Sequence, residues 1–239
     1  MKFFLRLLLL LLFPALSLTA QVPELVDLGL SVKWSSMNLG AECPEGYGDY
    51  FMWGEITPAN DRDCSWSTYK YANGAKNMLT KYVPKPNGST IGILRHVGAN
   101  IPESQTCGDN GFNDNKIVLD PQDDAAHVAL GGKFRMPTLK EWQELQKNCT
   151  WTWTQFNGVN GYICTSKVEG FTNKSIFLPA AGLRVDSVFL NQGLLGYYWS
   201  ASLNEYNPSN SWGCEFKESD QGWLIGNRCF GLSIRPVSE

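Results

Sequence analysis

The spacing of apolar and polar residues predicts two helices near the middle of this chain. The first is expected to begin with Asp120 as its N-cap and Pro121 in its first position, and to stop at residues 131–132, both glycine. Asp123 and Asp124 would then lie near its positive end, which a negative charge stabilises.

The second predicted helix starts at Thr138, which has the spacing of a capping box with Glu141. Trp142, Leu145 and Cys149 follow at intervals of three and four, so they share one face of the helix. We therefore expect this face to lie in the core.

A period of two predicts strands before and after the helices. Trp151 and Trp153 alternate with threonines, and the Asn-Gly pairs at 157–158 and 160–161 are typical of tight turns. Residues 55–118 are rich in Pro, Gly, Asn, Asp and Ser without a sustained period, which predicts long loops. The predicted strands are 30–34, 50–53, 162–164, 175–178, 197–200, 212–216 and 232–237.

Residues 1–20 have the pattern of a secretory signal peptide. Lys2 and Arg6 begin it, an apolar run follows, and small residues end it before a predicted cleavage between Ala20 and Gln21. A membrane anchor is the alternative, but the run is short of the roughly 20 apolar residues that a bilayer needs. We expect export to the periplasm, the cell surface or the medium, with no membrane span in the mature protein.

The charge of the chain argues against one class of partner. The 239 residues include 20 Lys and Arg and 23 Asp and Glu; without Lys2 and Arg6 of the signal peptide, 18 basic residues stand against 23 acidic ones, a net charge of −5. Nucleic-acid binders need a basic face. No nucleic-acid partner is therefore expected.

Seven cysteines and two histidines offer little for metal or nucleophilic chemistry. No Cys-x-x-Cys pair occurs, and His96 and His127 lie far from any cysteine pair, so no zinc site is predicted. The sequence also lacks the motifs of serine hydrolases, zinc peptidases and phosphate-binding loops. Export permits disulfides, but we expect several cysteines to be buried as small apolar residues instead.

Three segments of the sequence are distinctive when taken together. They are GKFRMPT at 132–138, FLPAAG at 177–182 leading to GYYWS at 196–200, and GLSIRPV at 231–237. In this order they resemble the Fibrobacter succinogenes major paralogous domain family (FISUMP), which is common in exported proteins of the Bacteroidetes and Fibrobacteres. The opening VDLGLSVKW at 26–34 also looks like this family.

The resemblance implies a C-type-lectin-like fold, shared with formylglycine-generating and sulfatase-modifying domains. Such a fold is α+β, with two helices packed on a small, twisted, mostly antiparallel sheet that joins the chain ends, and with extensive loops. Residues 21–239 would form this single domain. The fold hosts enzymes, glycan binders and protein binders, so it does not by itself choose a function.

The first functional hypothesis is a non-catalytic binding module that recognises a protein or a glycan through the loop-rich face of the C-terminal third. Some members of the wider group are diversified receptors whose C-terminal segment varies on a fixed scaffold, and here that segment is 204–230. Trp212 is expected in the core, because it alternates with Cys214 and Phe216. The candidate ligand-binding residues are Glu215, Lys217, Trp223, Leu224, Asn227 and Phe230.

Two other functions stay open. One is a structural or adhesin subunit of the cell surface. The other is an oxidase like the formylglycine-generating enzymes, which use two cysteines five residues apart. Cys229 matches the second position, but Leu224 occupies the first and cannot ligate copper. Because an inert buried cysteine also explains Cys229, we expect no catalytic residue.

A structural calcium ion is the only cofactor that the sequence suggests. Residues 108–115 are rich in oxygen ligands, and Asp109 and Asp114 are the candidates. Asp and Asn are also simple turn formers, which is the alternative.

Arg135 and Arg235 each stand beside a proline in the segments that carry the resemblance. We expect both to be structural and to bind acids or strand-end carbonyls.

Overall fold

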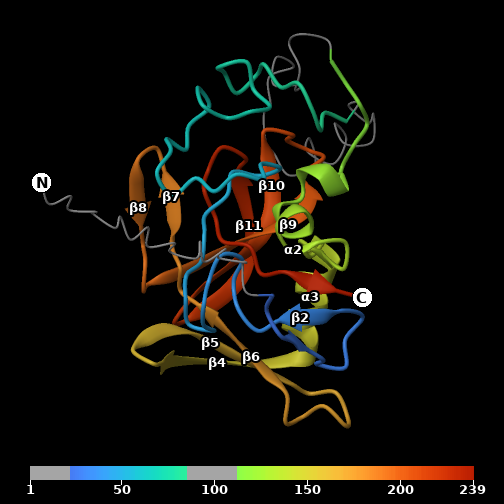
Figure 1. The fold of residues 1–239 in the computed structure, drawn as a ribbon, viewed down its shortest axis with the longest axis vertical. Coiled ribbons are helices and arrows are strands. Elements are labelled where there is room, and N and C mark those ends of the chain that lie inside the picture. Colours follow the sequence, from blue (N-terminus) through green and yellow to red (C-terminus); the bar gives the residue numbers. More distant parts are fainter. Residues whose placement is uncertain (1–21, 85–111) are drawn as a thin grey trace, which may run out of the picture.

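The computed structural model describes residues 22–84 and 112–239, which Figure 1 shows as short strands beside two α-helices. The strands form small sheets, and every pair of neighbours in them is antiparallel. The class is therefore α+β, as the sequence predicts.

Helix α3 (Leu139–Asn148) confirms the second predicted helix. The Thr138 hydroxyl accepts a hydrogen bond from the Glu141 N–H, and the Glu141 carboxylate accepts one from the Thr138 N–H at 2.7 Å. Trp142 and Leu145 are buried on the same face. The capping box and the apolar spacing thus fix where this helix begins and which side faces the core.

The prediction that Asp120 caps the first helix is wrong. A single 3-10 turn, η2 (Pro121–Asp123), comes first, and the α-helix α2 (Ala125–Leu130) starts after it with Asp124 as its N-cap. The Asp124 carboxylate accepts two N–H groups of the first turn, whereas Asp120 is drawn into ion pairs with two lysines. The predicted stop at Gly131 is confirmed.

One sheet joins the two ends of the described chain. It contains β1 (Leu25–Val26), β2 (Lys33–Ser35), β12 (Val237–Ser238) and β3 (Phe134–Arg135), in that order. Of the predicted strands 30–34 and 232–237, only the last residues belong to this sheet. The rest of 232–237 stays irregular, because its backbone bonds to four separate positions, at residues 35, 39, 51 and 199.

Three further sheets complete the fold. Strands β4 (Cys149–Phe156), β5 (Val159–Ser166) and β6 (Ser175–Pro179) form the first of them. A separate hairpin contains β7 (Leu183–Val185) and β8 (Val188–Leu190). The last sheet has the order β11-β10-β9 and is built from β9 (Leu195–Leu203), β10 (Asn210–Lys217) and β11 (Asp220–Asn227).

One of the two predicted Asn-Gly turns is correct. Asn157 and Gly158 both have positive φ, at 47° and 84°, and they connect β4 to β5. Asn160 and Gly161 instead lie inside β5, so the second predicted turn is wrong. Gly161 is needed there for close packing, because a Cβ at this position would overlap the backbone of Leu178 on the neighbouring strand.

The sequence pattern does not predict β11, although this strand carries several of the candidate binding residues. Gly222 and Gly226 interrupt it, and glycine is a weak strand former. Gly226 lies against the indole ring of Trp199, where an added Cβ would be 3.0 Å from the ring. Tertiary packing thus explains a glycine that reads as a loop residue.

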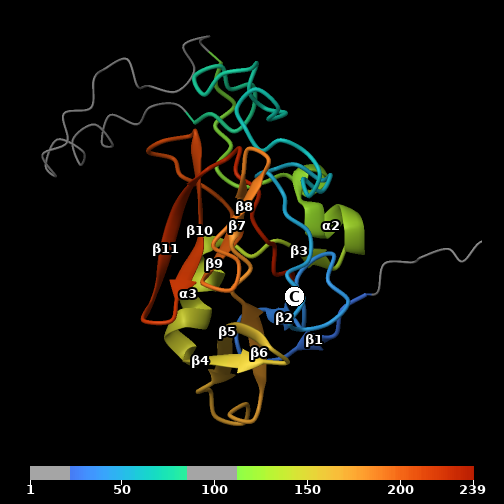
Figure 2. The same cartoon turned by 90° about the vertical axis from the view of Figure 1, so that its left-hand side faces the viewer.

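The β9–β11 sheet separates two hydrophobic cores. Tyr198 and Trp199 are neighbours in β9, yet Tyr198 packs with Trp142 of α3 in one cluster and Trp199 packs in the other. We call the first cluster the α3-side core and the second, which contains Tyr69 and Tyr82, the loop-side core. Figures 1 and 2 show α3 on one side of this sheet and the β7–β8 hairpin on the other.

The predicted loop region is confirmed for its described part, since residues 55–84 contain no named helix or strand. Its aromatic side chains nevertheless build the loop-side core. The hydroxyl groups of Tyr71 and Tyr82 both donate to the buried carboxylate of Asp123, which also binds the Lys81 ammonium. Asp123 therefore serves as the anchor of this loop rather than as a helix cap.

Arg135 and Arg235 are structural, as expected. Arg135 forms a two-pronged ion pair with Glu141, at 2.6 and 2.9 Å. Arg235 is fully buried and donates to the carbonyls of Ser35 and Phe177 and to the Asn38 side-chain oxygen, at 2.7 to 3.0 Å. It thereby ties the last strand region to the N-terminal segment and to β6.

Arg235→Lys is expected to lower the free energy of unfolding by about 3 kcal/mol, because one ammonium cannot reach three acceptors and would leave buried oxygens without a donor. Urea denaturation measures this loss. Arg135→Lys is the matched control, since its half-buried ion pair is expected to cost only about 1 kcal/mol. Equal losses for the two variants would contradict the role given to Arg235.

Asp123→Asn is expected to lower the free energy of unfolding by about 2 kcal/mol at neutral pH. Burial alone would raise the pKa of Asp123, but hydrogen bonds from Lys81, Tyr71 and Tyr82 outweigh it and hold the pKa below its ordinary value. The stability that this carboxylate contributes is present above the unfolded pKa of about 3.9 and is lost as the pH falls through the folded pKa.

The difference between the Asp123→Asn variant and the unmodified protein should therefore shrink in acid, and denaturation at a series of pH values tests this. The exposed Asp61→Asn serves as the control and should change stability little at any pH. If the difference in the free energy of unfolding stays constant down to pH 3, Asp123 is not ionised in the folded protein as proposed.

Candidate functional site

The β9–β11 sheet presents one partly open face on the side of the β7–β8 hairpin. Tyr197 of β9 lies opposite Glu215 of β10, which lies opposite Gly222 of β11. Nothing lies within 4 Å of a Cβ built on Gly222, so the space above this row is open. We call this surface the Tyr197 face.

Three of the six predicted binding residues lie on the Tyr197 face. Glu215 is in the middle row, the exposed Lys217 is in the next row toward solvent, and Leu224 is in the row that borders the loop-side core. Phe230 lies beyond β11 and packs against the margin of the same core. The alternation of side chains along β10 and β11 brings these residues together.

The other two candidates point the opposite way. Trp223 lies across from Cys214 and packs against the α3-side core, and Asn227 shares its face. A single surface that includes all six candidates is therefore wrong. The sequence offers no means of separating them as long as β11 is taken for a loop.

The sequence predicts a core position for Trp212, but its side chain is only half-buried. It shares a face with Cys214 and Phe216, which are buried, and lies opposite Ile225, which is 51% exposed. Helix α3 begins at Leu139, beside the end of β9, and later contacts the start of β11. Helix α3 therefore crosses this face of the sheet diagonally, and it does not cover the part of the face where Trp212 and Ile225 lie.

The carboxylate of Glu215 is a hydrogen-bond acceptor on the Tyr197 face. Partial burial, followed by the charge of Asp220, raises its pKa, while Lys217 acts in the other direction. Burial and the Glu215 charge also raise the pKa of the Tyr197 phenol. Among the described residues, no side chain forms an ion pair or a hydrogen bond with the Glu215 carboxylate.

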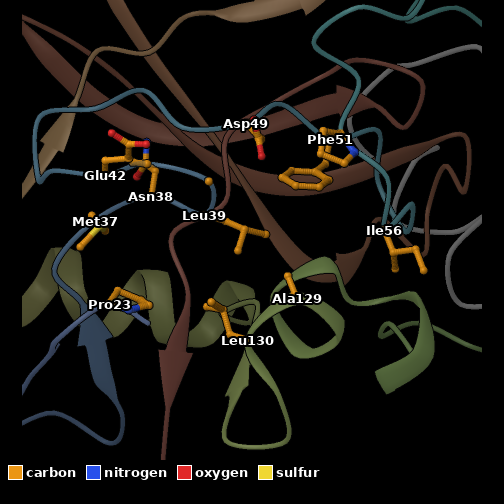
Figure 3. A pocket seen from close by; sticks show the side chains of 13 residues that line it. Pro23, Met37, Asn38, Leu39, Glu42, Asp49, Phe51, Ile56, Ala129 and Leu130 are labelled. Atoms are coloured by element: carbon orange, nitrogen blue, oxygen red, sulfur yellow. The ribbon is translucent and has the colours of Figure 1, made fainter. Parts of the chain in front are cut away.

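A cavity of about 440 Å³ is a second feature, and the sequence pattern does not predict it. It lies between the C-terminal end of α2 and two loop segments, 37–42 and 49–58 (Figure 3). Asp49, Glu42 and Asn38 supply polar groups. Its apolar lining includes Pro23, Met37, Leu39, Phe51, Ile56 and Leu130. Apart from the end of α2, the residues come from irregular segments, so no periodic signal reveals that they share a cavity.

Cys229, the candidate from the oxidase alternative, is buried in the loop-side core. Burial is the main cause that raises the pKa of its thiol to about 12. Leu224, at the expected partner position, lies in β11 opposite Gly213. A thiol that is neither ionised nor exposed at neutral pH is a poor nucleophile and a poor metal ligand.

The remaining cysteines of the described chain behave as apolar residues, as expected. Cys64, Cys149, Cys164 and Cys214 are buried, Cys43 is half-buried, and none of the described cysteines is in a disulfide. Burial raises the pKa of the Cys64 and Cys149 thiols to about 11.

The two calcium candidates have separate outcomes. Asp109 lies outside the described residues. The Asp114 carboxylate accepts the backbone N–H groups of Tyr82 and Val83, from a distant loop segment, and that of Lys116, two residues on. It thereby joins two loop segments. In the part of the chain that the structure describes, no group of three His, Cys, Asp or Glu side chains is placed to hold a metal ion.

Comparisons with protein-family models, with curated proteins and with solved structures find no match for this chain. Within residues 22–84 and 112–239, no helix is both long enough and apolar enough to cross a bilayer.

The thiol environments predict a specific order of alkylation. In a Cys107→Ser background, native protein treated with iodoacetamide at pH 8 should react at Cys43 first, and the five buried cysteines should react only after denaturation. Peptide mapping by mass spectrometry identifies the modified sites. Prompt alkylation of Cys229 in the native protein would contradict its inert role and return weight to the oxidase alternative.

Proposed function

We propose that this chain is an exported, non-catalytic binding module of C-type-lectin-like fold, which recognises a protein or a glycan through the Tyr197 face. The resemblance of the sequence to the FISUMP family supports the fold. So do two helices packed beside small antiparallel sheets, one of which contains strands near both ends of the described chain.

The observation that carries the proposal is the Glu215 carboxylate. It is partly withdrawn from water, yet it has no protein partner among the described residues. A carboxylate in this state gains from hydrogen-bond donors that a ligand brings, whether sugar hydroxyls or peptide N–H groups. Tyr197 beside it supplies a flat apolar ring, and bare Gly222 leaves room for a ligand to approach the sheet.

A structural or adhesin subunit is the second candidate, and the β7–β8 hairpin favours it. Val188, Phe189 and Leu190 are consecutive apolar residues in β8, and each is more than a third exposed. Nearby Leu194 is 66% exposed. An exposed apolar strand at a sheet edge is prone to pair with another chain.

A binding screen of the purified protein against glycans and surface proteins tests the proposal. Tyr197→Ala and Glu215→Gln should each weaken a hit about tenfold or more, because they remove the ring and the charged acceptor. Ile225→Ser and Asn227→Ala are matched controls in β11 of the same sheet, on the opposite face. Measurements with calcium and with a chelator show whether the ion takes part.

The outcomes separate the candidates. Loss of binding at Ile225→Ser but not at Tyr197→Ala would place the ligand on the wrong face for this proposal. No hit on folded protein would defeat it, and concentration-dependent self-association in that case, abolished by Leu190→Lys, would favour the structural subunit.

A further inference from the structure

The cavity in Figure 3 shares no lining residue with the Tyr197 face, and the proposed function does not use it. Its volume of about 440 Å³ lies within the range of small-molecule sites. We infer that it binds an organic cation with an apolar body, and that Asp49 holds the cationic nitrogen.

The apolar part of the cavity is built from rigid residues. Leu39 and Phe51 are buried, so their side chains are fixed by the loop-side core behind them. Leu130, at the end of α2, and the exposed Ile56 border the space from two other segments. Such walls favour an aliphatic or aromatic body, since water gains little from contact with them.

The polar part of the cavity has one sign of charge. Asp49 and Glu42 line it, and no Lys, Arg or His does. The Asn38 amide cannot serve a ligand in full, because its NH₂ donates to the Tyr47 carbonyl and its oxygen accepts from Arg235. Two carboxylates without a cation attract a positive ligand and repel a negative one.

Asp49 is placed to bind a donor from the cavity side. One carboxylate oxygen accepts from the Asn60 side chain at 2.6 Å. The other lies close to Gly40, where a Cβ would overlap it, and Gly40 has a positive φ of 80° that favours glycine. Because Gly40 has no side chain, this oxygen can pack against its backbone, and no described residue donates a hydrogen bond to it. Asp49 is half-buried and lines the cavity, so this oxygen can accept a donor from the cavity side.

Figure 3 shows the Asp49 carboxylate and the Phe51 ring facing the same space. A nitrogen cation between them would form a charge-assisted hydrogen bond to the carboxylate and would also face an aromatic ring, which attracts cations. An amine is thus preferred over an alcohol or an acid of the same shape.

Isothermal titration with three probes of similar size tests this preference. At pH 7, phenethylamine should bind about tenfold or more tightly than 2-phenylethanol, and 3-phenylpropionate should bind most weakly. In Asp49→Asn the amine and the alcohol should bind alike. Millimolar phenethylamine that fails to bind folded protein, or a preference that survives Asp49→Asn, would overturn the inference.

A second pair of variants locates the site without touching Asp49. Ala129 is exposed on α2 and lines the cavity, whereas its neighbour Val128 is exposed but does not line it. Ala129→Trp should block phenethylamine, and Val128→Trp should leave its affinity unchanged. Equal effects of the two variants would show that the amine binds elsewhere.

The cationic nitrogen can belong to a free amine or to the lysine side chain of a polypeptide. A further titration with a short lysine peptide distinguishes these two ligands. Acetyl-Leu-Lys-Leu-amide that binds more tightly than phenethylamine identifies a polypeptide ligand, and the reverse identifies a free amine. Tyr197→Ala should not change either affinity, so failure here and failure of the proposed function are independent results.

Discussion

Arg235 has no exposed surface, and its guanidinium group donates only to neutral oxygens, on Ser35, Asn38 and Phe177. Ser35 is the last residue of β2, Phe177 lies in the edge strand β6, and Asn38 lies in an irregular segment. Buried oxygens at such positions need donors from outside the sheet. A guanidinium offers five N–H donors in one plane. Arg235 therefore joins the end of β2, the edge strand β6 and the irregular segment at Asn38 to the C-terminal region, which a fold with such short strands requires.

Arg228 repeats this solution in the loop-side core. It is also fully buried, and it donates to the Tyr69 hydroxyl and to the carbonyls of Lys81, Tyr82 and Pro208. The guanidinium lies over aromatic rings as well, 4.8 Å from the Trp53 centroid. Arg235 and Arg228 thus fix the packing on the two sides of the β9–β11 sheet. The Tyr197 face, which is part of this sheet, is therefore held in a defined geometry.

The sequence predicts the parts of this fold whose signals are local. The capping box at Thr138, the Asn157-Gly158 turn and the alternating Trp151 and Trp153 depend on neighbours in the chain, so they are correct. The misassigned turn at Gly161 and the unpredicted strand around Gly226 depend on residues of other strands that pack against these glycines. At the site, the alternation along β10 correctly predicts the face that carries Glu215. Which residues of β11 share that face depends on how β11 pairs with β10, and the sequence pattern does not show this pairing.

The cavity depends on the same buried arginine. Asn38 lines the cavity while its side-chain oxygen accepts from Arg235, and the next residue, Leu39, donates its N–H to the Ile234 carbonyl. The Leu39 carbonyl in turn accepts from the Asp49 N–H at 2.8 Å. These hydrogen bonds thus connect the core to the backbone of Asp49, the residue whose carboxylate we assign to the cation. A pocket built on loops can hold a defined shape because its wall is continuous with this buried network.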